Sequence, residues 1–210
     1  MVEKFLARLL VVALFAAVLI VVPYSADPGA AQAVDSPVLV NVAPYGVASG
    51  SSQQFSGSVA GRAIDGNTSG VWRERSVTHT RHDDALPWWQ VDLGQDTVIE
   101  SITVWNRTDC CSERLSDFGV FVSETPFPVD ATISELEADP NVFSYSFDGA
   151  LDVTVDIPVA AVGRYVRVQK PAGTALSLAE VQVFEALTQD QPTEPDPGDC
   201  LLYTSDAADE

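Results

Sequence analysis

The amino-acid sequence predicts an all-β domain, an antiparallel β-sandwich, and three observations lead to this prediction. Short runs of β-branched and aromatic residues dominate the middle of the chain, and turn-forming residues separate them. Several runs alternate apolar with polar side chains, for example Tyr165-Val166-Arg167-Val168. No stretch in this part of the sequence carries a sustained helical period.

Each run is expected to form one strand. Trp88, Trp89 and Trp105 fall within these runs and are expected to pack in the core, as is Tyr165. In chain order, the expected strands are Trp88–Leu93, Val98–Trp105, Gly119–Ser123, Val142–Phe147, Leu151–Ile157, Arg164–Gln169 and Leu178–Phe184.

Residues 1–33 are predicted to be a signal peptide. Lys4 and Arg8 precede an unbroken apolar run, Leu9–Val22, and the small residues Ala31-Gln32-Ala33 provide a cleavage site. A membrane anchor is the alternative, but the run is shorter than the ~20 apolar residues that a spanning helix needs. We therefore expect export, and a secreted or cell-surface location.

Residues 34–187 form one predicted domain, long enough for a single core that buries ~70% of the surface of the unfolded chain. The net charge of −19, from 11 basic and 30 acidic residues, argues against nucleic acid and against anionic membrane lipid as partners, because both require a basic face. A neutral glycan is indifferent to this charge.

Residues 188–199 are rich in Pro and acidic residues and are predicted to be a linker, so we expect further domains beyond it. Residues 200–210 resemble the conceptual translation of a transposase adapter used in DNA library preparation. They are interpreted as a scar that does not belong to the natural protein. A genuine exposed tail is the alternative.

The most informative segment is Arg107-Thr108-Asp109-Cys110-Cys111-Ser112-Glu113-Arg114, read together with His79. It gathers two guanidiniums and a carboxylate in a chain with only two histidines. Arginine offers hydrogen-bond donors alone, whereas a neutral imidazole offers one donor and one acceptor. This set suits neighbouring hydroxyl groups and predicts a sugar as the ligand.

His79 followed by Arg107-x-Asp109-x-x-x-x-Arg114 resembles the motif of the F-type lectins, the fucose-binding domains of the discoidin and coagulation-factor C-domain superfamily. The resemblance covers about Val38 to Ala186. It implies an eight-stranded antiparallel β-sandwich jelly roll with the ligand loops at one end. The blocks that follow the family order are Ala63–Asn67, Trp72, Thr78–Thr80, Pro87–Gly94, Arg114–Leu115, Arg164–Val168 and Leu178–Val181.

The resemblance also implies roles in binding terminal L-fucose. His79, Arg107 and Arg114 would converge on the 3- and 4-hydroxyls and the ring oxygen, while Asp109 would lie behind an arginine and fix its plane. Trp72 would form the wall near the methyl group.

The adjacent cysteines would form a vicinal disulfide by the same resemblance, and this Cys110-Cys111 face would cover carbons 1 and 2 of the sugar. An exported protein is expected to oxidise its cysteines, but neighbours cannot form an ordinary bridge. Two free thiols or an intermolecular bridge are the alternatives.

Two departures from the family pattern concern the loops around this site. The gap between His79 and Arg107 holds 27 residues instead of 26, which an insertion in Arg81-His82-Asp83-Asp84 would explain. Gly50–Phe55 has no recognisable counterpart. His82 is expected to be an exposed loop residue without a role.

A structural Ca²⁺ is implied by the resemblance as well. Its oxygen ligands suit calcium better than a transition metal. Without the resemblance, Asp65-Gly66-Asn67 is merely a common turn. The expected ligands are the side chains of Asp65, Asn67, Ser76 and Glu180 and the carbonyls of Arg62 and Ala179.

The leading hypothesis is a non-enzymatic lectin module for fucosylated glycans. One alternative is the targeting module of a larger secreted glycan-active enzyme, truncated after the linker. Another is a discoidin-like adhesion domain that binds other glycans or lipid. A catalytic triad, zinc-ligand spacing and a phosphate loop are all missing from the domain sequence. The triplets at Asn67 and Asn106 fit the glycosylation acceptor pattern but fall within the proposed sites, which favours a bacterial origin.

Overall fold

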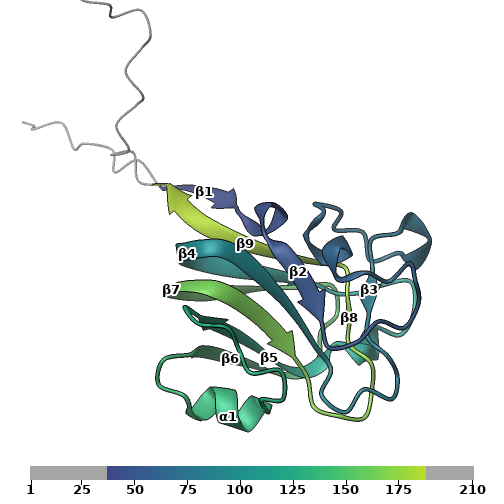
Figure 1. Ribbon diagram of the computed structural model, residues 1–210. Helices are drawn as coiled ribbons and strands as arrows, with labels where there is room; N and C mark the ends of the chain where they lie inside the picture. The colour runs from purple at the N-terminus through teal and green to yellow at the C-terminus, as the bar shows by residue number, and fades with distance from the viewer. Residues whose placement is uncertain (1–36, 188–210) are drawn as a thin grey trace, which may run out of the picture. The chain divides into compact units, whose positions relative to one another are not determined.

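The computed structural model describes residues 37–187 (Figure 1). The predicted signal peptide, linker and adapter-derived segment lie outside these residues. Between residues 37 and 187 the chain forms nine strands, and every strand pairing is antiparallel. The predicted all-β antiparallel class is therefore confirmed.

The strands differ widely in length: β4 has 18 residues, whereas β3 and β8 have 2 each. Four short 3₁₀ turns and one α-helix connect them within the described residues. The strands are β1 (Val38–Asn41), β2 (Val47–Gly50), β3 (Thr78–His79), β4 (Trp88–Trp105), β5 (Ser116–Ser123), β6 (Phe143–Ala150), β7 (Thr154–Gln169), β8 (Ser177–Leu178) and β9 (Glu180–Leu187); the turns are η1 (Ala43–Tyr45), η2 (Ala60–Ile64), η3 (Trp72–Glu74) and η4 (Ser112–Arg114), and the helix is α1 (Ile133–Ala138).

The two long strands β4 and β7 turn one sheet into two layers. The first part of β4 pairs with β2 and the end of β7, whereas its last part pairs with β9 and the start of β7. The register shifts between Asp92 and Thr97 and again between Ile99 and Ser101. Such irregularities bend a strand, so the sheet order β1-β9-β4-β7-β5-β6 folds over on itself.

Side chains from both layers meet in one core. Trp89 and Val168, from the first part of β4 and the end of β7, belong to the same buried cluster as Ile102 and Val183. The predicted count of eight strands differs from the observed nine. Two pairs of predicted strands are continuous in β4 and β7, and the short strands β1, β2 and β3 were not expected from the sequence.

The helix α1 was also not expected. Thr132 caps it through a reciprocal capping box, in which its hydroxyl accepts from the Glu135 backbone nitrogen and the Glu135 carboxylate accepts from the Thr132 backbone nitrogen. Leu136 anchors the helix in a second apolar cluster with Phe121 and Tyr165. Six residues are too few to show a helical period, and Thr132-x-x-Glu135 was the available signal.

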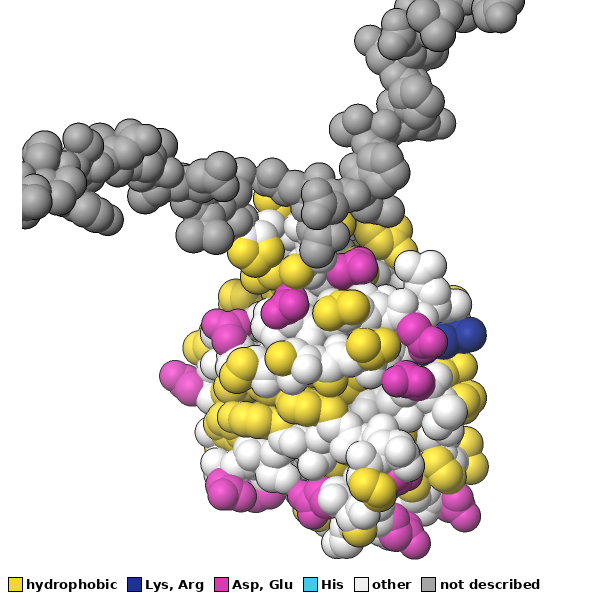
Figure 2. Space-filling view, turned by 90° about the vertical axis from the view of Figure 1, so that its left-hand side faces the viewer, with side chains coloured by type: hydrophobic (Ala, Val, Ile, Leu, Met, Phe, Trp, Pro, Cys, Tyr) yellow, Lys and Arg dark blue, Asp and Glu magenta, His cyan; other side chains and the backbone are white. Residues whose placement is uncertain are grey.

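The connections that follow β2, β3 and β4 gather at one end of the domain, at the right in Figure 1. The two-stranded sheet β3–β8 lies there and pairs His79 with Ser177. The face on the other side of the domain, shown in Figure 2, carries scattered acidic side chains among apolar and neutral ones. No helix within residues 37–187 has the length and apolar character needed to cross a membrane.

Candidate functional site

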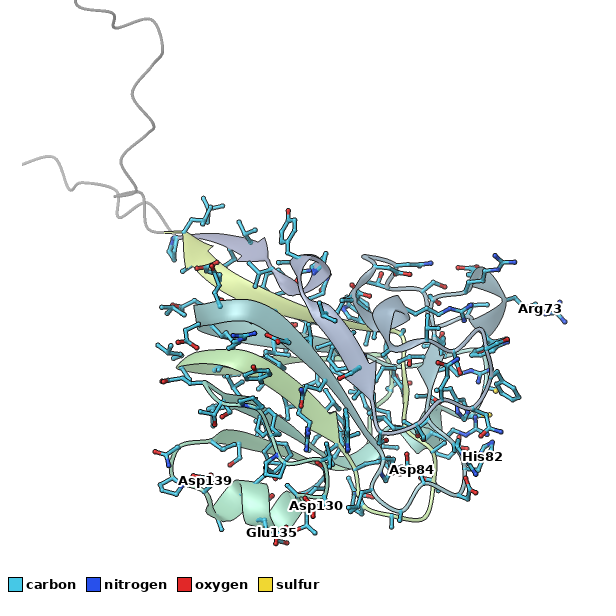
Figure 3. The ribbon with its side chains drawn as sticks, in the orientation of Figure 1. Arg73, His82, Asp84, Asp130, Glu135 and Asp139 are labelled. Atoms are coloured by element: carbon cyan, nitrogen blue, oxygen red, sulfur yellow. The ribbon has the colours of Figure 1, made fainter. Side chains whose placement is uncertain are left out.

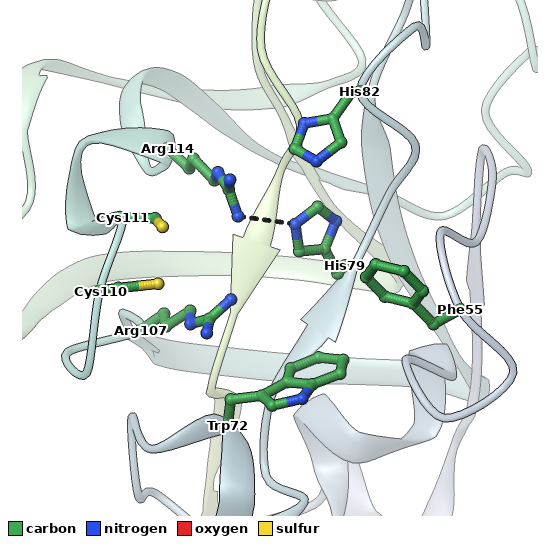
Figure 4. Close-up of a pocket in the computed structure, with 8 residues that line it drawn as sticks. All are labelled: Phe55, Trp72, His79, His82, Arg107, Cys110, Cys111 and Arg114. Atoms are coloured by element: carbon green, nitrogen blue, oxygen red, sulfur yellow. Dashed lines mark hydrogen bonds between the residues drawn. The ribbon is translucent and has the colours of Figure 1, made fainter.

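A cavity of about 390 Å³ opens among the loops at this end of the domain (Figure 4). It brings together side chains that are distant in the sequence, from the segment after β2 to the turn η4. Its lining includes each residue predicted to touch a sugar, together with two that were not: His79, Trp72, Arg107, Arg114, Cys110, Cys111, Phe55 and His82.

His79 lies on β3 with a buried side chain, and its hydrogen bonds define its tautomer. Its Nδ1 contacts the Thr80 carbonyl, which can only accept, so Nδ1 carries the proton. Nε2 is then the acceptor, and the Arg114 guanidinium donates to it at 2.8 Å (Figure 4).

The pKa of His79 lies below its ordinary value of 6.5. Burial is the main cause, and the nearby charges of Arg114, His82 and Arg107 act in the same direction, whereas the hydrogen bond to Thr80 opposes them. The ring is therefore neutral at neutral pH, with one donor and one acceptor.

Asp109 holds Arg107 in place. The resemblance implied that Asp109 would fix the plane of one of the two arginines. The guanidinium Nε donates to Asp109 Oδ1 at 2.6 Å, and the other carboxylate oxygen accepts from the Trp72 backbone nitrogen at 3.1 Å. Asp109 itself does not line the cavity. The ion pair holds the pKa of Asp109 below its usual value, so this carboxylate stays charged. It links the loop after β4 to the turn η3.

Trp72 contacts two guanidiniums. The ring centroid lies 5.3 Å from the guanidinium carbon of Arg107 and 5.4 Å from that of Arg62, both within the range of cation–π attraction. The indole therefore packs against an arginine of the predicted sugar site and against a residue whose carbonyl is a predicted calcium ligand.

Arg114 ends the turn η4, which starts after Cys111 in the left-handed conformation at φ 60°. Lys170 stabilises this turn, because its Nζ donates to the Arg114 carbonyl at 2.7 Å. The Lys170 side chain is buried, which lowers its pKa. Lys170 is the only lysine of the predicted domain and was not expected at the site.

Cys110 is exposed and Cys111 is half-buried, and both are free thiols in the structure. Both line the cavity. Because the two sulfurs are not bonded to each other in the structure, the vicinal disulfide stays a prediction.

Phe55 and His82 complete the cavity, and the sequence analysis assigned neither to it. The Phe55 ring stands edge-on to Trp72 and His79, with centroids 6.0 and 6.1 Å away. The His82 ring lies 5.1 Å from that of His79. His82 is exposed, as expected, and its ring also lines this cavity. Its position three residues after His79 was the available signal.

The predicted calcium ligands come from two parts of the chain: Arg62 in η2 with Asp65, Asn67 and Ser76 between η2 and β3, and Ala179 with Glu180 where β9 begins. Glu180 is fully buried, and its Oε1 accepts from the Gly66 backbone nitrogen at 3.0 Å. Its Oε2 is buried as well and has no hydrogen-bond partner within residues 37–187. Burial raises the pKa of Glu180 to about 7, and the charge of Asp65 contributes.

An unpaired buried carboxylate oxygen is costly unless it is protonated or neutralised by a cation. The predicted set also contains the buried Ser76 and the half-buried Asn67. Within residues 37–187 no group of three or more His, Cys, Asp or Glu side chains forms a metal cluster, and this set has two carboxylates. A hard cation bound by neutral oxygens and two carboxylates fits these residues.

Comparison with known proteins agrees with the fold. Residues 62–168 match the F5/F8 type C family model described as a NedA-like, galactose-binding domain. The chain is 35% identical over 153 residues to fucolectin-3 of Anguilla japonica. The aligned region covers 68% of this chain and 78% of that protein.

Two solved structures are similar in both sequence and fold. A fucose binding module of Streptococcus pneumoniae, SpX-3, is 31% identical with a TM-score of 0.60, over 70% of this chain and 99% of that one. The lectin domain of lectinolysin, solved in complex with Lewis B antigen, is 35% identical with a TM-score of 0.59, over 70% of this chain and 98% of that one. The chain therefore belongs to the F-type lectin, or fucolectin, family, within the discoidin-like superfamily of F5/F8 type C domains.

Proposed function

We propose that this domain is a lectin module that binds terminal L-fucose on glycans and has no catalytic activity of its own. The observation that carries the proposal is the convergence of Arg107, Arg114 and the neutral His79 on one cavity with aromatic walls. The names of the relatives support it, since they are fucolectins and fucose-binding modules.

The chemistry of fucose matches this combination of groups. The sugar has an axial hydroxyl at carbon 4 and a methyl group at carbon 5. A hydroxyl can accept from a guanidinium and donate to the His79 Nε2 lone pair, where it would take the place of the Arg114 donor. A sugar that directs this hydroxyl elsewhere leaves buried polar groups unpaired, at a cost of about 1–3 kcal/mol each. Trp72 and Phe55 supply apolar surface for the methyl group.

The decisive experiment is a calorimetric titration of the purified protein with methyl α-L-fucoside, with methyl α-D-glucoside as the control sugar. The wild type should bind only the fucoside. Arg107→Ala should weaken binding by roughly 10- to 100-fold, because a hydrogen bond from a charged group contributes about 1.5–3 kcal/mol.

A matched control is Arg164→Ala, which removes a guanidinium from an ion pair with Asp92 (2.7 Å) that does not line the cavity. This variant should bind the fucoside like the wild type. The proposal fails if the wild type ignores the fucoside, or if both arginine variants behave alike.

The vicinal disulfide belongs to the same proposal. Cys110 and Cys111 are adjacent at the cavity wall, and a bridge between them would turn two polar thiols into one rigid apolar face. The intact mass of the exported protein should rise by two hydrogen atoms on reduction. An unchanged mass would rule out the bridge.

We also propose that one Ca²⁺ binds the side chains of Asp65, Asn67, Ser76 and Glu180 with the carbonyls of Arg62 and Ala179. Its role would be structural, because it would neutralise the buried Glu180 and join the segment after η2 to β9. The apolar run Leu9–Val22 supports export, so we propose a secreted or cell-surface location.

A further inference from the structure

The segment between β4 and β5, residues 106–115, carries half of the residues that line the cavity of the candidate site: Arg107, Cys110, Cys111 and Arg114. Figure 3 shows this end of the domain, where His82 of the same cavity is labelled. Within residues 106–115 no residue pairs in a strand, and the three-residue turn η4 is the one regular element. Other contacts must therefore hold this segment in shape.

Asn106 begins the segment and is buried, with 1% of its surface exposed. Its Oδ1 accepts from the Arg107 backbone nitrogen at 2.7 Å. Its Nδ2 donates to the Ser112 carbonyl at 2.9 Å and to the Leu151 carbonyl at 2.6 Å. One side chain therefore joins the start of the segment, the start of η4 and the connection between β6 and β7.

Lys170 bonds to the other end of the same turn. It follows β7, and its buried side chain donates from Nζ to the Arg114 carbonyl at 2.7 Å and to the Thr174 hydroxyl. Ser112 and Arg114 are the first and last residues of η4, so both ends of the turn accept from buried side chains. The turn held in this way carries the Arg114 guanidinium, which donates to His79 beside the cavity (Figure 4).

Neither Asn106 nor Lys170 lines the cavity itself. The triplet that begins at Asn106 fits the glycosylation pattern, yet in the folded domain its Nδ2 is bonded to two carbonyls and the residue is buried. Lys170 forms no ion pair within residues 37–187, and burial lowers its pKa. Because apolar side chains of similar volume often stabilise a buried position at least as well as a charge does, stability of the core alone does not explain this lysine.

We propose that Asn106 and Lys170 are positioning residues of the fucose site. They hold the two ends of η4, and so they place the Arg107 and Arg114 guanidiniums for the sugar without touching it. The inference rests on the proposed fucose site. It assigns a role to a buried asparagine and a buried lysine that the sequence did not connect with the ligand.

The first test is Lys170→Met, which removes the Nζ donor and keeps an unbranched side chain in its place. The variant should melt no lower than the wild type, because it no longer buries a charge. Its affinity for methyl α-L-fucoside should nevertheless fall by about tenfold, since Arg114 is no longer held. The matched control is Thr174→Val, which removes the other acceptor of Nζ from an exposed residue. It should keep the affinity within about twofold.

The second test is Asn106→Asp, which keeps the shape of the side chain and the acceptor for the Arg107 nitrogen but has no donor for the Ser112 and Leu151 carbonyls. Its affinity for the fucoside should fall by about tenfold or more. The matched control is Asn41→Asp, which adds the same charge at an asparagine whose Oδ1 accepts from two backbone nitrogens elsewhere in the domain. It should bind the fucoside like the wild type. If Asn106→Asp does not fold, Lys170→Met decides the question.

A double-mutant cycle separates positioning from a general effect on the fold. In an Arg114→Ala background there is no guanidinium left to place, so adding Lys170→Met should change the affinity by less than about twofold. Chemical-shift titration with the fucoside measures these weak affinities. The inference is overturned if Lys170→Met binds like the wild type, or if its effect is the same with and without Arg114. A wild type that ignores the fucoside would overturn the proposed fucose site, and this inference with it.

Discussion

At the scale of single residues, burial and hydrogen bonding keep His79 neutral and fix its tautomer. Its Nδ1 proton is directed to the Thr80 carbonyl, so the lone pair of Nε2 faces the cavity side, where Arg114 donates to it. Protonation would remove this acceptor and place a third positive charge beside Arg114 and Arg107. Burial of the ring is the main cause of its lowered pKa, and the repulsion by these charges adds to it.

Fucoside binding should therefore depend on pH through His79. Since its folded-state pKa lies below 6.5, the ring stays neutral above that pH and becomes charged only as the pH falls through the lowered value. Affinity for methyl α-L-fucoside should be constant from pH 8 to about 6.5 and should fall in more acidic solution. Titrations between pH 8 and about 4.5 measure this.

The variant His82→Asn separates the two histidines, because His82 is exposed and only adjoins His79. It should keep the loss of affinity in acid. An affinity that stays level across the acidic range would show that the His79 lone pair takes no part in binding.

At the scale of elements, the segment before η3 and the loop after β4 approach each other so closely that Gly70 has no room for a side chain. A Cβ there would lie 2.6 Å from the Thr108 nitrogen and 2.7 Å from the Asn106 oxygen, both backbone atoms. The Gly70 carbonyl also accepts from the Thr108 nitrogen at 2.9 Å. This contact positions Trp72 against Arg107.

Gly70→Ala should therefore separate these two segments. We expect a loss of about 1–3 kcal/mol in the free energy of unfolding, as for other overpacked positions, and a weaker affinity for the fucoside. Thermal melting and titration measure the two effects.

Gly61→Ala is the matched control, because a Cβ at Gly61 would meet no atom within 4 Å. Its melting temperature and affinity should stay close to those of the wild type. If Gly70→Ala melts and binds as Gly61→Ala does, the close approach does not hold the site together.

At the scale of the whole molecule, the candidate calcium site joins segments from the two ends of the domain, since Glu180 begins β9 and Asp65 and Asn67 follow η2. Burial raises the pKa of Glu180 to about 7, which indicates that the folded domain alone stabilises its charge poorly. A bound cation would remove this cost and stabilise the folded state through mass action.

Calcium should therefore raise the melting temperature. At a free concentration about a hundred times Kd, the expected stabilisation is about 2.7 kcal/mol. A chelator should reverse it, and Glu180→Gln should abolish it. The control Glu137→Gln alters an exposed carboxylate that accepts from Ser146, and it should keep the response to calcium. Equal melting temperatures with calcium and with chelator would contradict the site.

The structure differs most from the sequence-based expectations at β4 and α1. The runs Trp88–Leu93 and Val98–Trp105 were predicted as two strands, because the residues between them are turn-forming, yet β4 continues through them with a shift in register. The helix α1 has only 6 residues, too few for an apolar pattern to repeat at the helical period, and only its capping box marks it.

Some site residues could not be predicted because no local pattern distinguishes them. Phe55 and Lys170 belong to separate segments, and each reaches the site only through long-range contacts. Lys170, for example, meets the Arg114 carbonyl across 56 positions of sequence.

The sequence by itself determined the all-β class, since alternation of apolar and polar residues reports which face of a strand is buried. It also determined the chemistry of the candidate site, because a group of arginines, a carboxylate and cysteines is concentrated in Arg107–Arg114. Only the tertiary structure decided which other side chains share that cavity and which buried side chains bond to the turn η4. Those contacts depend on pairings such as His79 with Ser177, whose partners are remote in the chain and leave no local signal.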